Sequence, residues 1–182
     1  MFWRPDVSPG TVIVTSAPTG FGVDREFEPA ALQTMIADRA SETGRHVVIA
    51  DAHGDLSAWL HGPNAGQRPA ALVPLDDTLD LRIEVLERFA RRLQGRAAGP
   101  LPRALQLTGQ RRARLVLLLH ALDFRLRGAE LREIAAALID ADHAALPAIE
   151  WKSSATRRKA NRLVHDALAL MNRGYLELLR GE

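Results

Sequence analysis

The hydrophobic pattern of this sequence changes once, close to residue 76, and that change limits the folds open to the chain. Before it, short apolar and β-branched runs such as TVIVT at 11–15 are separated by loops containing glycine and proline. Runs of this kind predict strands. After it, apolar residues recur every three or four positions, which predicts helices. We therefore expect an α+β protein, in which a small and mostly antiparallel β unit with one helix precedes an all-helical part.

The β unit is expected to contain at least one hairpin. RHVVIAD at 45–51 and DLSAWL at 55–60 are both rich in strand-forming residues, and Gly54 lies between them. Residues 29–39 are ambiguous, and we expect a helical turn there followed by a strand. AALVPL at 70–75 predicts a short strand, which its proline would place at a sheet edge or a strand end.

Three helices are expected between the change of pattern and residue 138. Asp76, Asp77 and Thr78 would cap the first, which runs to about Leu93. Its expected inner face consists of Leu79, Ile83, Leu86, Ala90 and Leu93. The second helix, at 111–127, is expected to turn inward Leu115, Leu118, Leu119, Leu122 and Leu126. The inner face of the short third helix, at 129–138, is expected to consist of Leu131, Ile134, Ala135 and Leu138.

The boundary between the two parts is expected where glycine, alanine and proline gather without periodicity. GRAAGPLPR at 95–103 has this composition. We therefore predict an α+β domain at 1–94, a linker at 95–107 and a helical domain at 108–182. The formal charge of residues 1–102 is −3 and that of residues 103–182 is +5. A basic C-terminal half favours an anionic partner for that half.

The stretch at 150–179 is expected to form one helix with two different halves. Its first half is basic and its second half is aliphatic. Ser153 or Ser154 would cap its start, and Gly174 would end it in a left-handed conformation. The expected buried stripe consists of Ala160, Leu163, Val164, Ala167, Leu170 and Met171. The residues expected on the opposite face are Ser154, Arg158, Arg162 and His165.

This division of the helix has two interpretations. A helix with its back in a core and a cationic front has the arrangement that a recognition helix needs in the major groove of DNA. A solvated charged face gives the same pattern without any partner. The helix alone does not decide between them.

Other classes of function find little support in the sequence. There is no cysteine, so disulfides and thiolate metal sites are excluded. The six histidines include no pair at helical spacing, and we expect neither a metal site nor a cofactor. No nucleotide-binding or hydrolase motif is present, so we do not expect an enzyme. The absence of a long apolar run and of a secretory signal predicts a cytoplasmic protein without a membrane partner.

Two runs carry a resemblance to a known family. They are LLHALDFRLRGAELREIAAAL at 118–138 and EWKSSATRRKANRLVHDALALMNRGYLELL at 150–179. They resemble the bacterial domain of unknown function 2285, whose pattern is LDxRLxGxxxREIAxxL followed by WKxSSxRxxxxRLVxxxLxLMxxGYxxLL. The resemblance extends over about residues 108–182. The chain departs from the pattern at Ala155, where a leucine is expected, and at Lys159, where an arginine is common.

The resemblance implies a variant helix-turn-helix regulator of integrative and conjugative elements. It implies a cytoplasmic transcription regulator that binds double-stranded DNA and controls the genes of a mobile element. The alternative within the same family is an antiactivator, which grips a partner regulator protein and binds DNA weakly or not at all. A homodimer is a further candidate assembly. Residues 129–138 and 154–172 would be the two helices of the motif. The gap of about 14 residues between them is wider than an ordinary turn of about three or four residues, so the motif would be a variant.

The expected DNA-binding residues lie around the start of the basic helix. Arg158, Arg162 and Ser154 would face the groove, since arginine pairs with guanine and serine bonds to base edges or phosphates. Cationic side chains beside them would hold phosphates without specifying sequence. The full predicted set is Lys152, Ser153, Ser154, Arg157, Arg158, Lys159 and Arg162.

Overall fold

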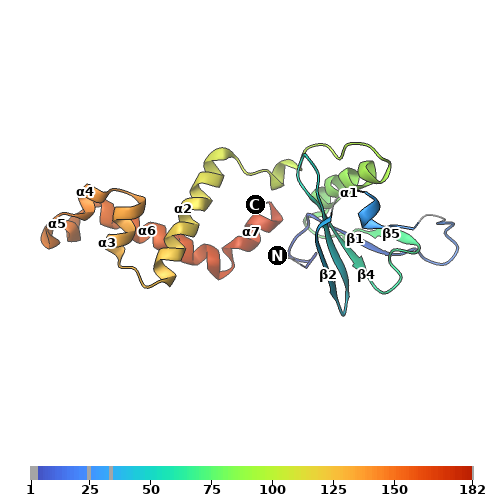
Figure 1. The fold of residues 1–182 in the computed structure, drawn as a ribbon, viewed down its shortest axis with the longest axis horizontal. Helices are drawn as coiled ribbons and strands as arrows, with labels where there is room; N and C mark the ends of the chain where they lie inside the picture. Colours follow the sequence, from blue (N-terminus) through green and yellow to red (C-terminus); the bar gives the residue numbers. More distant parts are fainter. Residues whose placement is uncertain (1–3, 24–25, 33–34, 182) are drawn as a thin grey trace. The chain divides into compact units, whose positions relative to one another are not determined.

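The computed structural model describes residues 4–23, 26–32 and 35–181 (Figure 1). The chain divides into two compact units. The first comprises Met1–Gln106 with Leu176–Glu182, and the second comprises Leu107–Tyr175. Among the described residues, no helix is both long enough and apolar enough to cross a membrane. The predicted domain limits at 94 and 108 remain a prediction.

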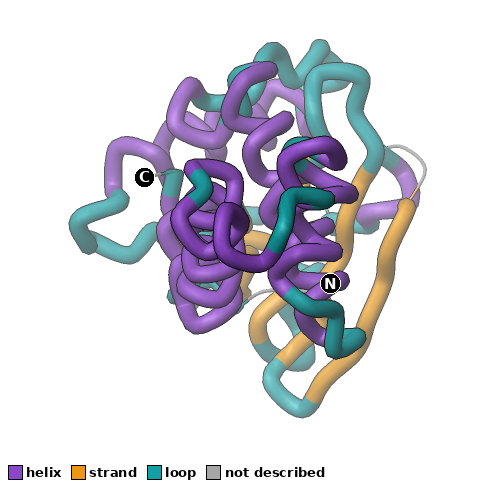
Figure 2. The backbone as a smooth tube through the Cα atoms, turned by 90° about the vertical axis from the view of Figure 1, so that its left-hand side faces the viewer, coloured by secondary structure: helices purple, strands orange, loops and turns teal. Residues whose placement is uncertain are grey.

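A five-stranded sheet forms the first unit. Its strands are β1 (Thr11–Ser16), β2 (Met35–Ser41), β3 (Gly44–Ile49), β4 (Leu56–His61) and β5 (Pro69–Leu72). They are ordered β2-β3-β4-β1-β5, and β1 pairs with β4 in parallel while the other neighbours are antiparallel. The α+β prediction is therefore confirmed, with a mostly antiparallel sheet ahead of a helical region. Figure 2 shows the strands in orange and the helices in purple.

The predictions for the strands of this unit agree with the structure. A 3-10 turn at Pro29–Ala31 is followed by β2, as expected for residues 29–39. The predicted hairpin is confirmed, because β3 and β4 pair antiparallel around the loop that contains Gly54. The strand predicted at 70–75 is β5, which lies at the sheet edge and ends at Leu72, before the proline.

The helix α1 (Leu79–Leu93) covers one face of the sheet (Figure 1). Its expected inner face is only partly confirmed, since Leu86 and Leu93 pack against the core. It buries Leu81, Val85 and Phe89, whereas Ile83 is 43% exposed. The sequence offers two overlapping apolar stripes on this helix, and the buried one carries its only aromatic ring. Phe89 packs edge-to-face against Phe27 with ring centroids 5.4 Å apart. Aromatic side chains bury more area than aliphatic ones, which favours this face.

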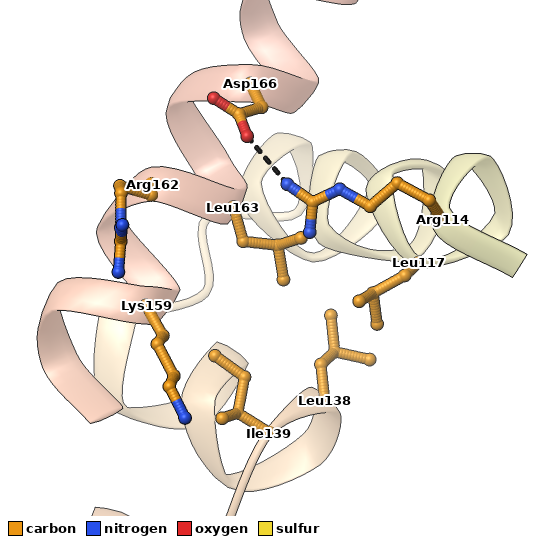
Figure 3. A pocket seen from close by; sticks show the side chains of 8 residues that line it. All are labelled: Arg114, Leu117, Leu138, Ile139, Lys159, Arg162, Leu163 and Asp166. Carbon is orange, nitrogen blue, oxygen red and sulfur yellow. Dashed lines mark hydrogen bonds and ion pairs between the residues drawn. The ribbon is translucent and has the colours of Figure 1, made fainter. Parts of the chain in front are cut away.

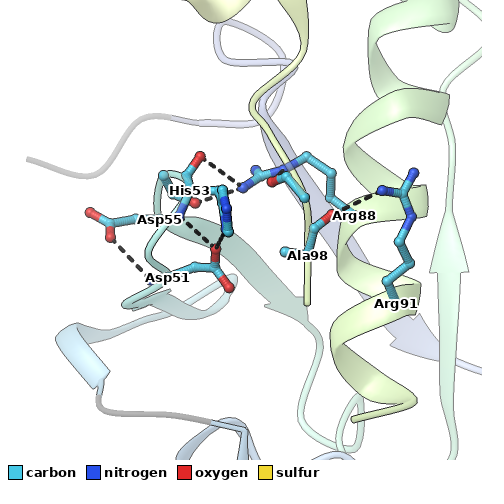
Figure 4. Close-up of polar contacts among 8 residues, drawn as sticks. Asp51, His53, Asp55, Arg88, Arg91 and Ala98 are labelled. Atoms are coloured by element: carbon cyan, nitrogen blue, oxygen red, sulfur yellow. Dashed lines mark hydrogen bonds and ion pairs between the residues drawn. The ribbon is translucent and has the colours of Figure 1, made fainter. Parts of the chain in front are cut away.

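Arginines of α1 hold the neighbouring loops (Figure 4). Arg88 is 4% exposed. Its guanidinium donates to the carbonyl oxygens of Gly54 at 2.7 Å and Gly99 at 3.1 Å. Burial lowers the pKa of Arg88 from its ordinary value. Arg91 donates to the carbonyl of Ala98 at 3.1 Å. The predicted linker is therefore fastened to the first unit over these positions.

Five α-helices form the second unit. They are α2 (Gly109–Leu126), α3 (Leu131–Leu138), α4 (Ala141–Ala144), α5 (Ala148–Ser153) and α6 (Ala155–Ala169). Thr108 caps α2, with its hydroxyl accepting from the N–H of Arg111 at 3.1 Å. The buried core consists of Leu118, Ala121, Ile134, Leu163, Val164 and Ala167. The predicted inner face of α3 is confirmed, with two of its residues fully buried.

The inner face predicted for α2 is partly wrong. Leu118 is buried, but Leu119 is 57% exposed and Leu126 is 66% exposed. Leucines surround this helix, so their spacing alone does not identify the covered side. The structure turns Leu118 and Ala121 toward α3 and α6, which leaves the opposite side of the helix in solvent.

The prediction of one helix over 150–179 is partly wrong, because two breaks divide the stretch, one at the predicted Ser154 cap and one beside the predicted Gly174. Ser154 has extended backbone angles (φ −65°, ψ 147°) and separates α5 from α6. A second break follows α6 at Leu170–Gly174, before α7 (Tyr175–Arg180). The left-handed residue there is Arg173, at φ 92°, and not the predicted Gly174. Apolar burial continues across the first break, where Trp151 of α5 is buried in a core that also includes Ala160 of α6.

Candidate nucleic-acid interface

The helix α6 carries a cationic face opposite its buried stripe, as predicted. Ala160, Leu163, Val164 and Ala167 are buried, while Arg158, Arg162 and His165 are exposed. Thr156 is also buried, which the apolar pattern did not indicate. The stripe continues beyond α6 to Leu170, which packs against the core, but Met171 is 42% exposed and does not belong to it.

The start of α6 is fixed by a serine, and the choice between the two candidates is settled. The hydroxyl oxygen of Ser154 accepts from the backbone N–H of Arg157 at 3.0 Å. Ser153 is instead the last residue of α5, and its hydroxyl donates to the carbonyl of Glu150 at 3.1 Å. Each serine thus secures the end of a different helix.

Two of the predicted DNA-binding arginines reach back to α5. Arg157 donates to the carbonyl of Lys152 at 3.1 Å, and Arg158 donates to the carbonyl of Ser153 at 2.7 Å. The last carbonyls of a helix have no partner within that helix, so these bonds satisfy them. The sequence did not indicate this role of the two arginines, because the role depends on α5 ending at Ser153. The remaining N–H donors of each guanidinium are still available to a phosphate.

Another arginine joins the site from α2 and was not predicted. Arg114 pairs with Asp166 of α6 at 2.7 Å between Nη2 and Oδ2 (Figure 3). This pair borders a cavity of about 490 Å³, whose apolar walls come from α2, α3 and α6. Lys159 and Arg162 line the same cavity and have no carboxylate partner among the described residues. Nothing in the local sequence around Arg114 indicates that α2 passes beside α6.

Trp151 anchors α5 in the helical core. It is 8% exposed, and the guanidinium carbon of Arg132 lies 5.1 Å from its ring centroid. Arg132 also donates to the carbonyl of Leu146 at 3.0 Å. The segment between α3 and α6, residues 139–154, thus contains two packed short helices in place of an ordinary turn. If α3 and α6 act as a helix-turn-helix, the motif is a variant one.

The seven predicted site residues therefore extend from the end of α5 over the first two turns of α6. The structure brings the side chains of Arg157 and Arg158 onto the end of α5, and it places Lys159 and Arg162 along the neighbouring cavity. Their contact with DNA remains a prediction. Within the part of the chain that the structure describes, no cluster of three or more histidine or acidic side chains could hold a metal ion.

Comparison with protein families gives two matches. Residues 72–180 match the family RovC_DNA-bd, described as T6SS, Transcription factor, DNA binding domain. Residues 10–71 match a domain of unknown function, DUF7012. No curated protein matches the chain.

The first match includes α1, all of the helical unit and α7. It identifies the class of protein, a DNA-binding transcription regulator, which is not a class of enzyme. Because the match extends over more than half of the chain, the chain belongs to the RovC_DNA-bd family. The match supports the expected DNA-binding domain, but it does not single out the domain of unknown function 2285.

Proposed function

We propose that this regulator reads double-stranded DNA with α6. Arg158 and Arg162 face the groove together with Ser154, and Lys152, Arg157 and Lys159 hold phosphates with the help of Ser153. The observation that carries the proposal is the exposed cationic face of α6, directly opposite a stripe buried in the core. The buried stripe fixes the position of the helix, so its exposed face can enter a groove without the entropic cost of ordering the backbone.

The start of α6 supports the same proposal. The first amides of a helix have no acceptor within it and lie at the positive end of the helix dipole. Ser154 satisfies only the N–H of Arg157. A phosphate placed there would be bound by the preceding amides and by Lys152 at the end of α5. Backbone phosphate contacts of this kind position a protein on DNA without specifying sequence.

The regulated genes are the second part of the proposal. The resemblance of residues 118–138 and 150–179 to the domain of unknown function 2285 suggests genes of a mobile element. The description of the matched family names T6SS instead. We propose mobile-element genes, and promoter DNA from both kinds of locus distinguishes the two. We further propose that residues 1–94 form the α+β domain and residues 108–182 the DNA-binding domain.

The test is fluorescence anisotropy of the full chain with labelled promoter DNA from its own locus. The variant is Arg158→Ala/Arg162→Ala. Arg125→Ala/Arg127→Ala is the matched control, because it removes the same charge from the end of α2. We expect the α6 variant to lose at least about tenfold in affinity and the control to lose much less.

The salt dependence tests the nature of the contact. If each protomer neutralises about four phosphates, log K falls with log salt at a slope of about −3.6. Equal losses in the two double variants would place the contact away from α6. Absence of binding at low salt would favour the antiactivator alternative, in which the protein grips a partner regulator.

A further inference from the structure

The helix α2 carries apolar side chains on two opposite sides, and only one side is covered. Leu118 and Ala121 are buried against the rest of the helical unit. On the other side, Val116 is 47%, Leu119 57% and Leu126 66% exposed. An apolar stripe on a helix is normally turned toward a core or a partner. The outer side of α2 is therefore suited to a partner.

The exposed residues form a straight line along the helix. Arg112, Val116, Leu119, Asp123 and Leu126 follow one another at alternating steps of four and three residues. This is the spacing of a seam between two packed helices. Leu115 and Leu122, which are half-buried, lie along the flank of the line and widen its apolar surface. We name these five residues, 112, 116, 119, 123 and 126, the α2 seam.

The α2 seam carries one positive and one negative side chain, which could pair with those of a second copy. Arg112 lies near its amino end and Asp123 near its carboxyl end. Neither side chain makes a hydrogen bond or ion pair with another residue in the ranges that the structure describes. In two parallel copies, like charges would face each other. In two antiparallel copies, Arg112 faces Asp123 of the partner subunit.

One twofold axis satisfies both the charged and the apolar residues. When the axis crosses α2 midway between Leu117 and Leu118, Arg112 lies opposite Asp123 of the partner subunit. The same axis places Val116 opposite Leu119 of the partner subunit. Leu126 then lies opposite Gly109 of the partner subunit, which leaves it room. An interface about such an axis uses the same patch twice, as closed dimers do.

We propose that two copies of this chain pair through the α2 seam, with the two α2 helices antiparallel. The contact of one helix with its copy is small, so the free dimer is weak. Two adjacent half-sites on DNA would strengthen it, because the second contact becomes intramolecular. The proposal does not depend on which residues contact DNA, since the dimer is measured without DNA.

The test is sedimentation velocity of the full chain over a range of concentrations, without DNA. The variants are Asp123→Arg, Arg112→Asp and the double exchange. Each single variant places like charges opposite each other and is expected to raise the dimer dissociation constant by roughly tenfold or more. The double exchange restores opposite charges and is expected to return the constant to within about threefold of the original.

Two further variants complete the experiment. Asp142→Arg makes the same charge change on exposed α4 and is expected to leave dimerisation unchanged. Leu119→Ser tests the apolar contact, and its exposure means that the monomer should still fold. A chain that stays monomeric throughout would overturn the proposal. So would an unchanged Leu119→Ser variant, or a double exchange that stays as impaired as the single variants.

Discussion

Replacing Trp151 by alanine should remove most of the stability of the helical unit. Trp151 is 8% exposed, so nearly all of its side chain is withdrawn from water. A buried aromatic side chain of about 150–250 Å² contributes about 4–6 kcal/mol at 25 cal/mol per Å². That area is an upper estimate, because unfolded chains already bury part of it. Loss of the Arg132 contact adds about 0.5–1 kcal/mol. We expect a loss of about 4 kcal/mol, within the range of core tryptophan substitutions.

The assay is urea unfolding of the full chain, followed by circular dichroism at a helix wavelength. Ile149→Ala is the matched control, because it shortens an apolar side chain of the same helix that is 81% exposed. We expect it to change the free energy of unfolding by no more than about 0.5 kcal/mol. Trp151→Leu should retain part of the packing and unfold at an intermediate midpoint. A Trp151→Ala variant within about 1 kcal/mol of the original chain would refute this account of α5.

Three further substitutions test other parts of the fold. Ser154→Ala should cost about 1 kcal/mol in urea unfolding, because it removes the cap of α6, while Ser153→Ala should cost less. Arg173→Gly should stabilise the chain by about 0.5–1 kcal/mol. Glycine relieves the strain of the positive φ of 92°, and this gain exceeds the loss from its greater freedom in the unfolded chain. A lower unfolding midpoint would contradict this. Asp76 accepts from Arg82, whose hydrogen bonds hold the pKa of that carboxyl well below its ordinary value. Its contribution to stability is thus present above the ordinary carboxyl pKa and is lost as pH falls below it, so Asp76→Asn should flatten the acid side of a pH–stability curve.

The sequence correctly predicts those parts of the fold in which the apolar residues of an element lie on one face only. In the sheet, β-branched runs with a glycine between them form the expected hairpin of β3 and β4. In α6, the buried stripe is flanked by charged residues, so only one side of the helix can enter the core. The same holds for α3, where Ile134 and Ala135 are buried as expected.

The errors fall where apolar residues cover more than one side of a helix. In α2, leucines occur all round, and the position of α3 and α6 decides which of them are buried. In α1, two stripes overlap, and the one with Phe89 packs on the sheet. Periodicity identifies that a helix is amphipathic, but the covered side of a doubly apolar helix depends on contacts between distant segments.

The separate helices α5 and α7 on either side of α6 were missed for a different reason. Neither Ser154 nor Arg173 is a residue that stops a helix by itself, and the apolar spacing continues through both positions. The burial of Trp151 and the capping bonds of Ser154 stabilise the first break. Trp151 packs with residues of α3 and α4, so the sequence around the break does not by itself determine where α5 ends.

Because of the break at Ser154, the side chain of Arg158 also makes a structural hydrogen bond to α5. Arg162 has no such role. The side chain of Arg158 donates to the carbonyl of Ser153, whereas the side chain of Arg162 makes no hydrogen bond to a residue within the described ranges. A guanidinium held in this way has lost part of its freedom before DNA arrives, which lowers the entropic cost of a phosphate or base contact. Lysine keeps the charge but not the planar fork of donors. We therefore expect Arg158→Lys to weaken DNA binding more than Arg162→Lys at the same salt concentration, and to lower the unfolding midpoint as well. Anisotropy titrations of the two variants with the same promoter DNA measure the difference, and equal losses in affinity would show that the bond to α5 does not prepare Arg158 for DNA.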